Sequence, residues 1–223
     1  MNKVFKVFRY QVYESLAAVA IFYAAMLFVT LLLTVWDGSS SGFEFATAIF
    51  IFVVGLNSFK TNFRFMQFLS VTRKTFFLGT LLALVAIAAG MAVIDIAWGR
   101  LYAQLQPYSS LFSQAYAQGS IFAQFVWEFA LLAMFAFGGL FITALYYRSN
   151  RVLKIVISLS PVYISIILNL LQPSVEQMIR IFAFLGGFRE GVTVWSNLLG
   201  MFVTVLISVG LSFLLIRRAP VKR

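Results

Sequence analysis

Six apolar stretches, each long enough for a helix that crosses a lipid bilayer, occupy most of the 223 residues of this chain. A helix needs roughly 20 mostly apolar residues to cross a hydrocarbon core of about 30 Å. The sequence therefore predicts an all-α polytopic membrane protein with no second domain. The expected spans are residues 16–36, 43–59, 76–98, 121–147, 155–171 and 195–216, of which the second and fifth are short.

Lysine and arginine residues gather in alternate gaps between these stretches. All of them except Arg100, Arg180 and Arg189 lie in the N-terminal segment, in the second and fourth gaps or in the C-terminal tail. Cytoplasmic segments of membrane proteins carry this excess of positive charge, so we expect both termini in the cytoplasm. The net charge of +10 then reflects topology and attraction to anionic membrane lipids, and it does not indicate nucleic-acid binding.

The composition excludes several classes of protein. Hydrophobic residues make up 62% of the chain, too many for a protein that stays soluble and monomeric in water. The absence of cysteine and histidine excludes disulfides, thiolate chemistry, a serine–histidine protease and a histidine-ligated metal centre, so we expect no metal site. Trp36-Asp37-Gly38 follows the first apolar stretch without a small-residue cleavage pattern, so we expect a retained span rather than a signal peptide.

Residues 1–15 predict a separate amphipathic helix. Apolar side chains recur there at steps of three and four residues from Val4 to Leu16, and the basic residues take other positions. A basic amphipathic helix of this kind lies in the headgroup plane of a membrane. The alternative is a frayed tail that only follows the charge rule.

Residues 60–75, the second gap, are unusually apolar for a segment in water. Apolar side chains alternate there with polar ones from Phe63 to Val71. A solvated loop has no need for them, so we expect a short helix whose apolar side rests on the bundle or on a partner. Ser70-Val71-Thr72 then predicts a break before the third span begins.

The run Phe-Met-Gln-Phe-Leu-Ser-Val-Thr-Arg-Lys-Thr-Phe, within Arg64 to Phe77, leads into the third expected span. Many small bacterial permease subunits of ATP-binding-cassette (ABC) transporters of the type-2 exporter class carry a similar run there, and this chain resembles them. Thr72 stands where that class often has serine. Outside this run the chain resembles the class only in the arrangement of its elements, an N-terminal interfacial helix followed by six spans.

The gap between the fifth and sixth spans supports the resemblance, because short external helices that dip back into the membrane occupy it in that class. Residues 173–194 begin at Pro173, continue with a helical stripe of apolar side chains and break at Gly186-Gly187. Irregular backbone at membrane depth survives only when it is packed in protein, which suits a re-entrant hairpin. The alternative is an ordinary surface loop with an amphipathic turn.

The resemblance implies the permease half of an ATP-driven exporter of a hydrophobic or amphipathic substrate, such as a peptide, in the bacterial cell membrane. The chain has no Gly-x-x-x-x-Gly-Lys-Ser/Thr phosphate loop, so ATP and Mg²⁺ would bind a separate ABC-type ATPase subunit. This chain would then bind no cofactor and would not be an enzyme. Six helices are too few to line a path with two faces, so we expect a homodimer or a pair with a second permease.

In that class, the helix between the second and third spans sits in a groove of the ATPase, so that nucleotide-driven closure moves the spans. By this resemblance residues 148–154 form a second, minor contact with the ATPase. For Arg73 and Lys74 the charge rule is the better explanation, and we expect them to contact lipid headgroups. The residues that the resemblance assigns to ATPase coupling are Asn62, Phe63, Arg64, Met66, Gln67, Leu69, Arg148 and Arg151.

Two acidic residues lie within expected spans: Asp95 near the external end of the third, and Glu128 about two turns into the fourth. Charged side chains inside a membrane are costly, and they usually line a cavity or a proton path. Two interpretations stay open. Either the acids are paired or solvated near the interface, with Arg100 within reach of Asp95, or they line a translocation path together with Asn169 of the fifth span.

Two other functions remain alternatives. A six-span substrate-binding subunit of a vitamin importer has a similar length and also borrows an ATPase, but it needs a ligand-shaped external pocket that the Phe-rich spans do not indicate. A proton-coupled secondary transporter would use Asp95 and Glu128 to carry protons. Whatever the function, Gly138-Gly139 of the fourth span and the alanine-rich third span predict that these helices pack closely against their neighbours.

Overall fold

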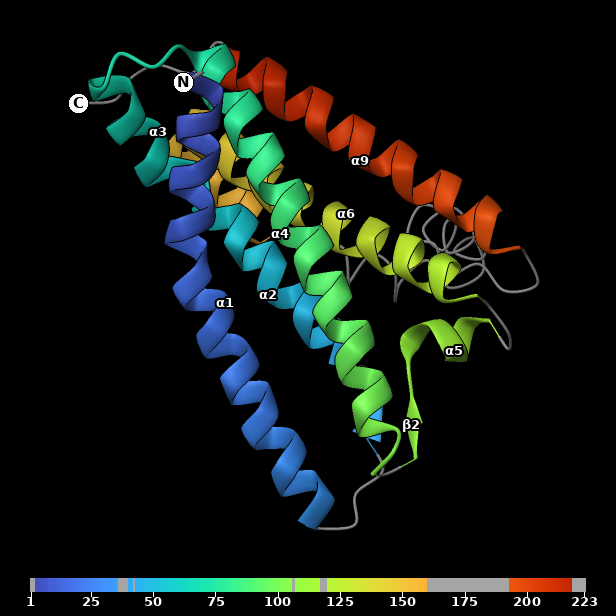
Figure 1. Ribbon diagram of the computed structural model, residues 1–223. Helices are drawn as coiled ribbons and strands as arrows, with labels where there is room; N and C mark the ends of the chain where they lie inside the picture. Colours follow the sequence, from blue (N-terminus) through green and yellow to red (C-terminus); the bar gives the residue numbers. More distant parts are fainter. Residues whose placement is uncertain are drawn as a thin grey trace.

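The computed structural model describes residues 3–35, 40–41, 43–105, 107–116, 120–159 and 193–217. In this part of the chain the architecture is a helical bundle, as the sequence predicts (Figure 1). The four helices that are long and apolar enough to cross a membrane are α1 (Lys3–Val35), α4 (Arg73–Tyr102), α6 (Ile121–Arg148) and α9 (Val194–Arg217). Helix α2 (Phe43–Asn57) is equally apolar but shorter.

Two predicted segments fall largely outside the described residues. Residues 151–159 are helical and include the start of the fifth expected span, and the remainder of 155–171 is not described. Asn169 and all but the last two residues of the expected re-entrant segment 173–194 lie outside the described residues as well. The all-α class is therefore confirmed, with four described helices that are long and apolar enough to cross a membrane.

Helix α1 differs from the prediction of a separate N-terminal helix, because it runs without a break through residues 15 and 16. Its first turns pack against α4: a Cβ atom on Gly79 would lie 2.6 Å from Cβ of Val7, and Val7 is buried. One turn later the amide of Gln11 reaches Thr80 of α4 at 2.9 Å. These contacts with α4 explain why the first turns of α1 continue along the bundle and do not lie in the headgroup plane.

Helix α6 is central to the bundle, since α2, α4 and α9 all pack on it. Alanine and glycine at steps of three residues let these neighbours approach its backbone. The buried residues of this three-residue series are Ala130, Ala133, Ala136 and Gly139. Thr143 adds a polar contact, because its hydroxyl donates to the Leu56 carbonyl of α2 at 2.7 Å.

Both ends of the described chain lie at one end of the bundle, together with the short helix α3 (Lys60–Phe68) (Figure 1). After α3 the backbone turns at Ser70, which has a φ of 54°, and Thr72 caps α4 by accepting from the Thr75 amide at 3.3 Å. The predicted short helix and the predicted break before the third span are both present.

The opposite end of the bundle is built from short elements. Strand β1 (Ser40–Ser41) pairs in parallel with β2 (Tyr108–Ser109), and α5 (Leu111–Ala115) follows. The hydroxyl of Ser110 caps α5, and the hydroxyl of Ser120 caps α6. These contacts bring the start of α2 close to the segment between α4 and α6.

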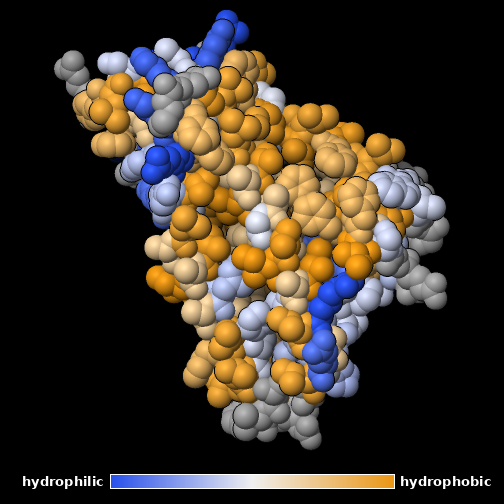
Figure 2. Space-filling model, viewed as in Figure 1, coloured by the Kyte–Doolittle hydropathy of each residue, from blue (hydrophilic) through white to orange (hydrophobic). Residues whose placement is uncertain are grey.

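The visible surface between the two ends is mostly hydrophobic, and hydrophilic residues gather near the termini and in a second patch toward the other end (Figure 2). Large apolar side chains are exposed along the long helices; Ile21 of α1 is 70% exposed and Leu206 of α9 is 69% exposed. Such extended apolar surface would be unfavourable in water and fits contact with lipid chains.

Candidate functional site

Helix α3 carries most of the residues that the sequence assigns to coupling, and the structure divides them by burial. Asn62, Phe63 and Met66 are buried against the rest of the chain. Gln67 is partly exposed, and its side-chain amide donates to the Val71 carbonyl at 2.9 Å, which holds the turn after the helix. Leu69 is exposed, and the side chain of Arg64 lies outside what the structure describes.

An aromatic cluster fixes α3 to the bundle. The ring of Phe63 stacks on Phe59 at a centroid distance of 4.9 Å and meets the edges of Phe76 at 5.3 Å and Tyr147 at 6.1 Å. Phe59, Phe63 and Phe76 are completely buried. Aromatic pairs of this geometry add stability beyond the area that they bury, so α3 is held on α4 and α6 from one side.

The other side of α3 is apolar and exposed. Phe68 is 86% exposed, Leu69 58% and Phe65 45%. Phe65 stacks on Tyr10 of α1 at 5.4 Å, at the edge of a groove of about 410 Å³ that Lys3 and Lys6 also line. The sequence analysis did not assign Phe65 and Phe68 to coupling. They follow Phe63 by two and five residues, so in a helix they lie on the side opposite Phe63.

The second predicted contact lies at the same end of the bundle. Arg148 ends α6 and Arg151 begins the next helix, and both are exposed. Ser149 joins the two helices and is buried; its hydroxyl donates to the Leu145 carbonyl at 2.6 Å. Lys154 lies over the ring of Tyr146 at 5.0 Å, so this basic segment is packed on α6 as well.

A cluster of acidic side chains lies toward the opposite end of the bundle. The hydroxyl of Tyr23 on α1 is 2.8 Å from Oδ1 of Asp95 on α4 and 3.2 Å from the Met91 carbonyl. Glu128 of α6 is 2% exposed, and its side chain is within hydrogen-bonding reach of Asp95. Asp95 thus turns toward Tyr23 and Glu128, and Arg100, the partner considered from the sequence, is exposed.

Glu44 is a third member of this cluster that the sequence analysis missed. It sits in the first turn of α2, where an acid usually indicates only a favourable contact with the helix dipole. The carboxyl is nevertheless buried, and it bonds the side chain of Tyr108 and the backbone of Leu111. Burial and the neighbouring Glu44 carboxylate raise the pKa of the Tyr108 hydroxyl well above its usual range, so Tyr108 remains a donor.

The three carboxyl groups each keep one buried oxygen without a hydrogen-bond donor: Oε2 of Glu44, Oδ2 of Asp95 and Oε1 of Glu128. Two carboxyl groups can bond each other only when one carries a proton, because an ionised carboxylate has no donor. Within the described residues no group of three acidic side chains has the geometry of a metal site.

Comparison of the chain with protein-family models, with curated proteins and with solved structures finds no match. The assignment of function therefore rests on the sequence and on the geometry of the two ends of the bundle.

Proposed function

We propose that this chain is the permease subunit of an ATP-driven exporter and that α3 couples it to a separate ATPase subunit. The observation that carries the proposal is the position of α3, an amphipathic helix that Phe63 fixes to the end of the bundle while Phe68 and Leu69 project away from it. An exposed phenylalanine on a helix fixed in this way is favourable when another protein covers it.

The charge pattern supports this orientation of the bundle. Arg73 donates to the Arg217 carbonyl at 2.9 Å, which places the basic start of α4 beside the end of α9. Lys3 and Lys6 lie at the same end, next to Phe65. Basic residues concentrate on the cytoplasmic side of membrane proteins, so in this proposal α3 and both termini face the cytoplasm, where an ATPase works.

The complete permease half in this proposal has six spans, with a re-entrant hairpin before the last one, and it works as a dimer or with a second permease. The apolar character of the long helices fits an amphipathic or hydrophobic substrate such as a peptide. The carboxyl cluster would then line or brace the path at the outer end.

Site-specific photo-crosslinking tests the coupling role. Replacing Phe68 by p-benzoylphenylalanine keeps an aromatic side chain at a position of α3 that is 86% exposed. In cells of the native organism we expect a crosslink to a protein that carries a phosphate loop. The matched control places the same crosslinker at Ile21, which is 70% exposed on α1 and should give no crosslink to a protein with a phosphate loop. The absence of such a crosslink at Phe68 as well would refute the coupling role.

The carboxyl cluster favours a second candidate, a proton-coupled secondary transporter. Asp95 and Glu128 lie together in the bundle, as a shared proton site requires. The two candidates differ in energy source. Transport into proteoliposomes separates them, with an imposed pH gradient and a fluorescent amphipathic cation as cargo. If this chain alone accumulates the cargo and Glu128→Gln abolishes the accumulation, transport is coupled to protons. If the cargo accumulates only when the crosslinked ATPase and ATP are added, the chain belongs to an exporter.

A further inference from the structure

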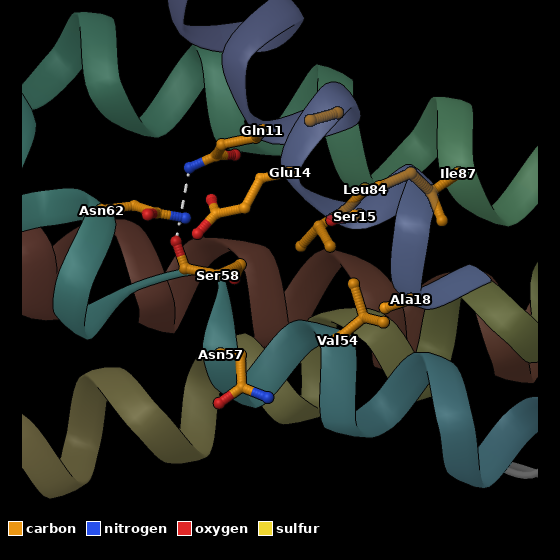
Figure 3. Close-up of a pocket in the computed structure, with 11 residues that line it drawn as sticks. Gln11, Glu14, Ser15, Ala18, Val54, Asn57, Ser58, Asn62, Leu84 and Ile87 are labelled. Carbon is orange, nitrogen blue, oxygen red and sulfur yellow. Dashed lines mark hydrogen bonds between the residues drawn. The ribbon is translucent and has the colours of Figure 1, made fainter. Parts of the chain in front are cut away.

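A polar cavity of about 130 Å³ lies between α1, α2, α4 and the start of α3, close to the end of the bundle that carries α3 (Figure 3). Gln11, Glu14 and Ser15 line it from α1. Asn57 at the end of α2, Ser58 after it and Asn62 in the first turn of α3 line it from the other side. Leu84 and Ile87 of α4 form an apolar wall. None of these side chains is basic, so the polar part of the lining carries one formal charge, the carboxylate of Glu14.

Gln11 presents a fixed acceptor to this cavity. Its amide nitrogen donates to the Thr80 hydroxyl at 2.9 Å and to the Ser58 carbonyl at 3.3 Å. The hydroxyl proton of Thr80 is already used, since it donates to the Phe76 carbonyl at 3.0 Å. The positions of Nε2 and Oε1 in Gln11 therefore cannot be interchanged. Oε1 remains without a hydrogen-bond donor, although Gln11 is only 3% exposed.

Ser58, Asn62 and Glu14 offer further acceptors to the cavity, although the amides of Asn57 and Asn62 also carry N–H donors, and the Asn62 nitrogen lies toward Glu14 and Ser58 (Figure 3). The hydroxyl of Ser58 donates to the Gly55 carbonyl at 2.7 Å, so its oxygen can only accept from the cavity side. Oδ1 of Asn62 has no donor, and the residue is 3% exposed. The carboxylate of Glu14 points toward Ser58 and Asn62 (Figure 3), and Glu14 itself is exposed, which leaves an entry from outside.

Buried acceptors without donors are costly, and the cost disappears when a cation or its water supplies the missing partner. Amide, hydroxyl and carboxylate oxygens are the ligands of hard cations. A single carboxylate balances one positive charge, and the volume equals that of about four waters at roughly 30 Å³ each. We propose that this cavity binds a monovalent alkali-metal ion, Na⁺ or K⁺, which keeps part of its hydration shell and ties α1 to α3.

Thermal unfolding of the full-length protein, purified in detergent, tests this site independently of any ATPase. NaCl or KCl replaces choline chloride at constant ionic strength, because the methyl groups of choline keep oxygen ligands away from its charged nitrogen. We expect the midpoint of unfolding to rise with the concentration of Na⁺ or K⁺ and to saturate, as binding to the folded state requires. Glu14→Gln, at an exposed position that should still fold, should raise the half-saturating concentration at least tenfold.

Glu44→Gln is the matched control, since it makes the same chemical change in the carboxyl cluster at the other end of the bundle. It should leave the half-saturating concentration unchanged. Equal midpoints in NaCl, KCl and choline chloride would mean that water alone fills the cavity, and the proposal would then be wrong. An ion response that survives Glu14→Gln or is lost in Glu44→Gln would place the ion elsewhere and overturn the proposal as well.

Discussion

Gly139 of α6 lies against Gly55 of α2, so closely that a Cβ atom on Gly139 would be 3.2 Å from the carbonyl carbon of Gly55. The same atom would overlap the Phe52 carbonyl oxygen, and a Cβ atom on Gly55 would overlap the Ala136 carbonyl oxygen. The obstacles are backbone atoms, which cannot move aside as a flexible side chain can. This close contact between α2 and α6 thus depends on the absence of a side chain at both Gly55 and Gly139.

Gly139→Ala should therefore destabilise the protein, because α2 and α6 must separate to admit the methyl group. Overpacking of this kind costs about 1–3 kcal/mol. Thermal unfolding in detergent measures the loss. The neighbouring Gly138 provides the control, since a Cβ atom there meets nothing within 4 Å, and Gly138→Ala should leave the midpoint unchanged or slightly raised. Equal midpoints in both variants would contradict the assigned contact.

The sequence predicts that Gly138-Gly139 allows close helix packing, but it cannot tell which of these two glycines contacts α2. That choice depends on the rotation of α6 about its axis, which the partners α2, α4 and α9 set together. Hydropathy and charge are local properties, and they predict the long helices, the short helix α3 and the break before α4 well. The burial of Asn62 and the continuity of α1 depend on tertiary contacts.

The carboxyl cluster illustrates the same limit. Asp95 and Glu128 could be singled out, because charged residues inside an apolar stretch are rare. Glu44 begins its helix and resembles an ordinary interfacial acid, and only the folded chain brings Tyr108 to it. The acceptors of the polar cavity come from Gln11 and from the α2–α3 segment, and no spacing in the sequence indicates that these segments meet.

Two aspartate substitutions on α3 should separate stability from coupling. Met66→Asp places a charge where the side chain is 5% exposed, so it should lower stability by at least about 2 kcal/mol. Phe68→Asp changes a side chain that is 86% exposed and should leave the unfolding midpoint nearly unchanged. In the proposed function Phe68→Asp instead abolishes transport and co-purification of the ATPase.

Phe122→Asp is a control for Phe68→Asp, because Phe122 is 65% exposed near the start of α6, at the other end of the bundle. It should leave co-purification of the ATPase intact. Full transport activity of Phe68→Asp would show that the exposed side of α3 has no role in coupling.

Cysteine labelling can test the orientation of the chain in the membrane. No native cysteine has to be replaced first, because the chain contains none. Asn150→Cys lies between α6 and the next helix, and Ala115→Cys lies at the end of α5; both positions are exposed. In intact cells an impermeant thiol reagent should modify Ala115→Cys and leave Asn150→Cys unmodified, and both should react after permeabilisation. The opposite pattern would place α3 outside the cell and rule out its contact with a cytoplasmic ATPase.

Asp95 and Glu128 should behave as one unit in a double-mutant cycle. The two side chains are within bonding reach, so each amide substitution changes the partner of the other group. We expect the effects of Asp95→Asn and Glu128→Gln on the free energy of unfolding to differ from additivity by about 0.5–3 kcal/mol. Thermal and denaturant unfolding of the two single variants and the double variant give this value.

The comparison pair is Glu128→Gln with Gln11→Met, which lie toward opposite ends of the bundle and share no contact among the described residues. Their effects should add within about 0.5 kcal/mol. Tyr23→Phe removes the hydroxyl that donates to Asp95 at 2.8 Å, and it should cost about 1 kcal/mol in the wild-type background. Additive effects of Asp95→Asn and Glu128→Gln would mean that the two carboxyl groups do not share a proton, and the proton-coupled candidate would lose its structural basis.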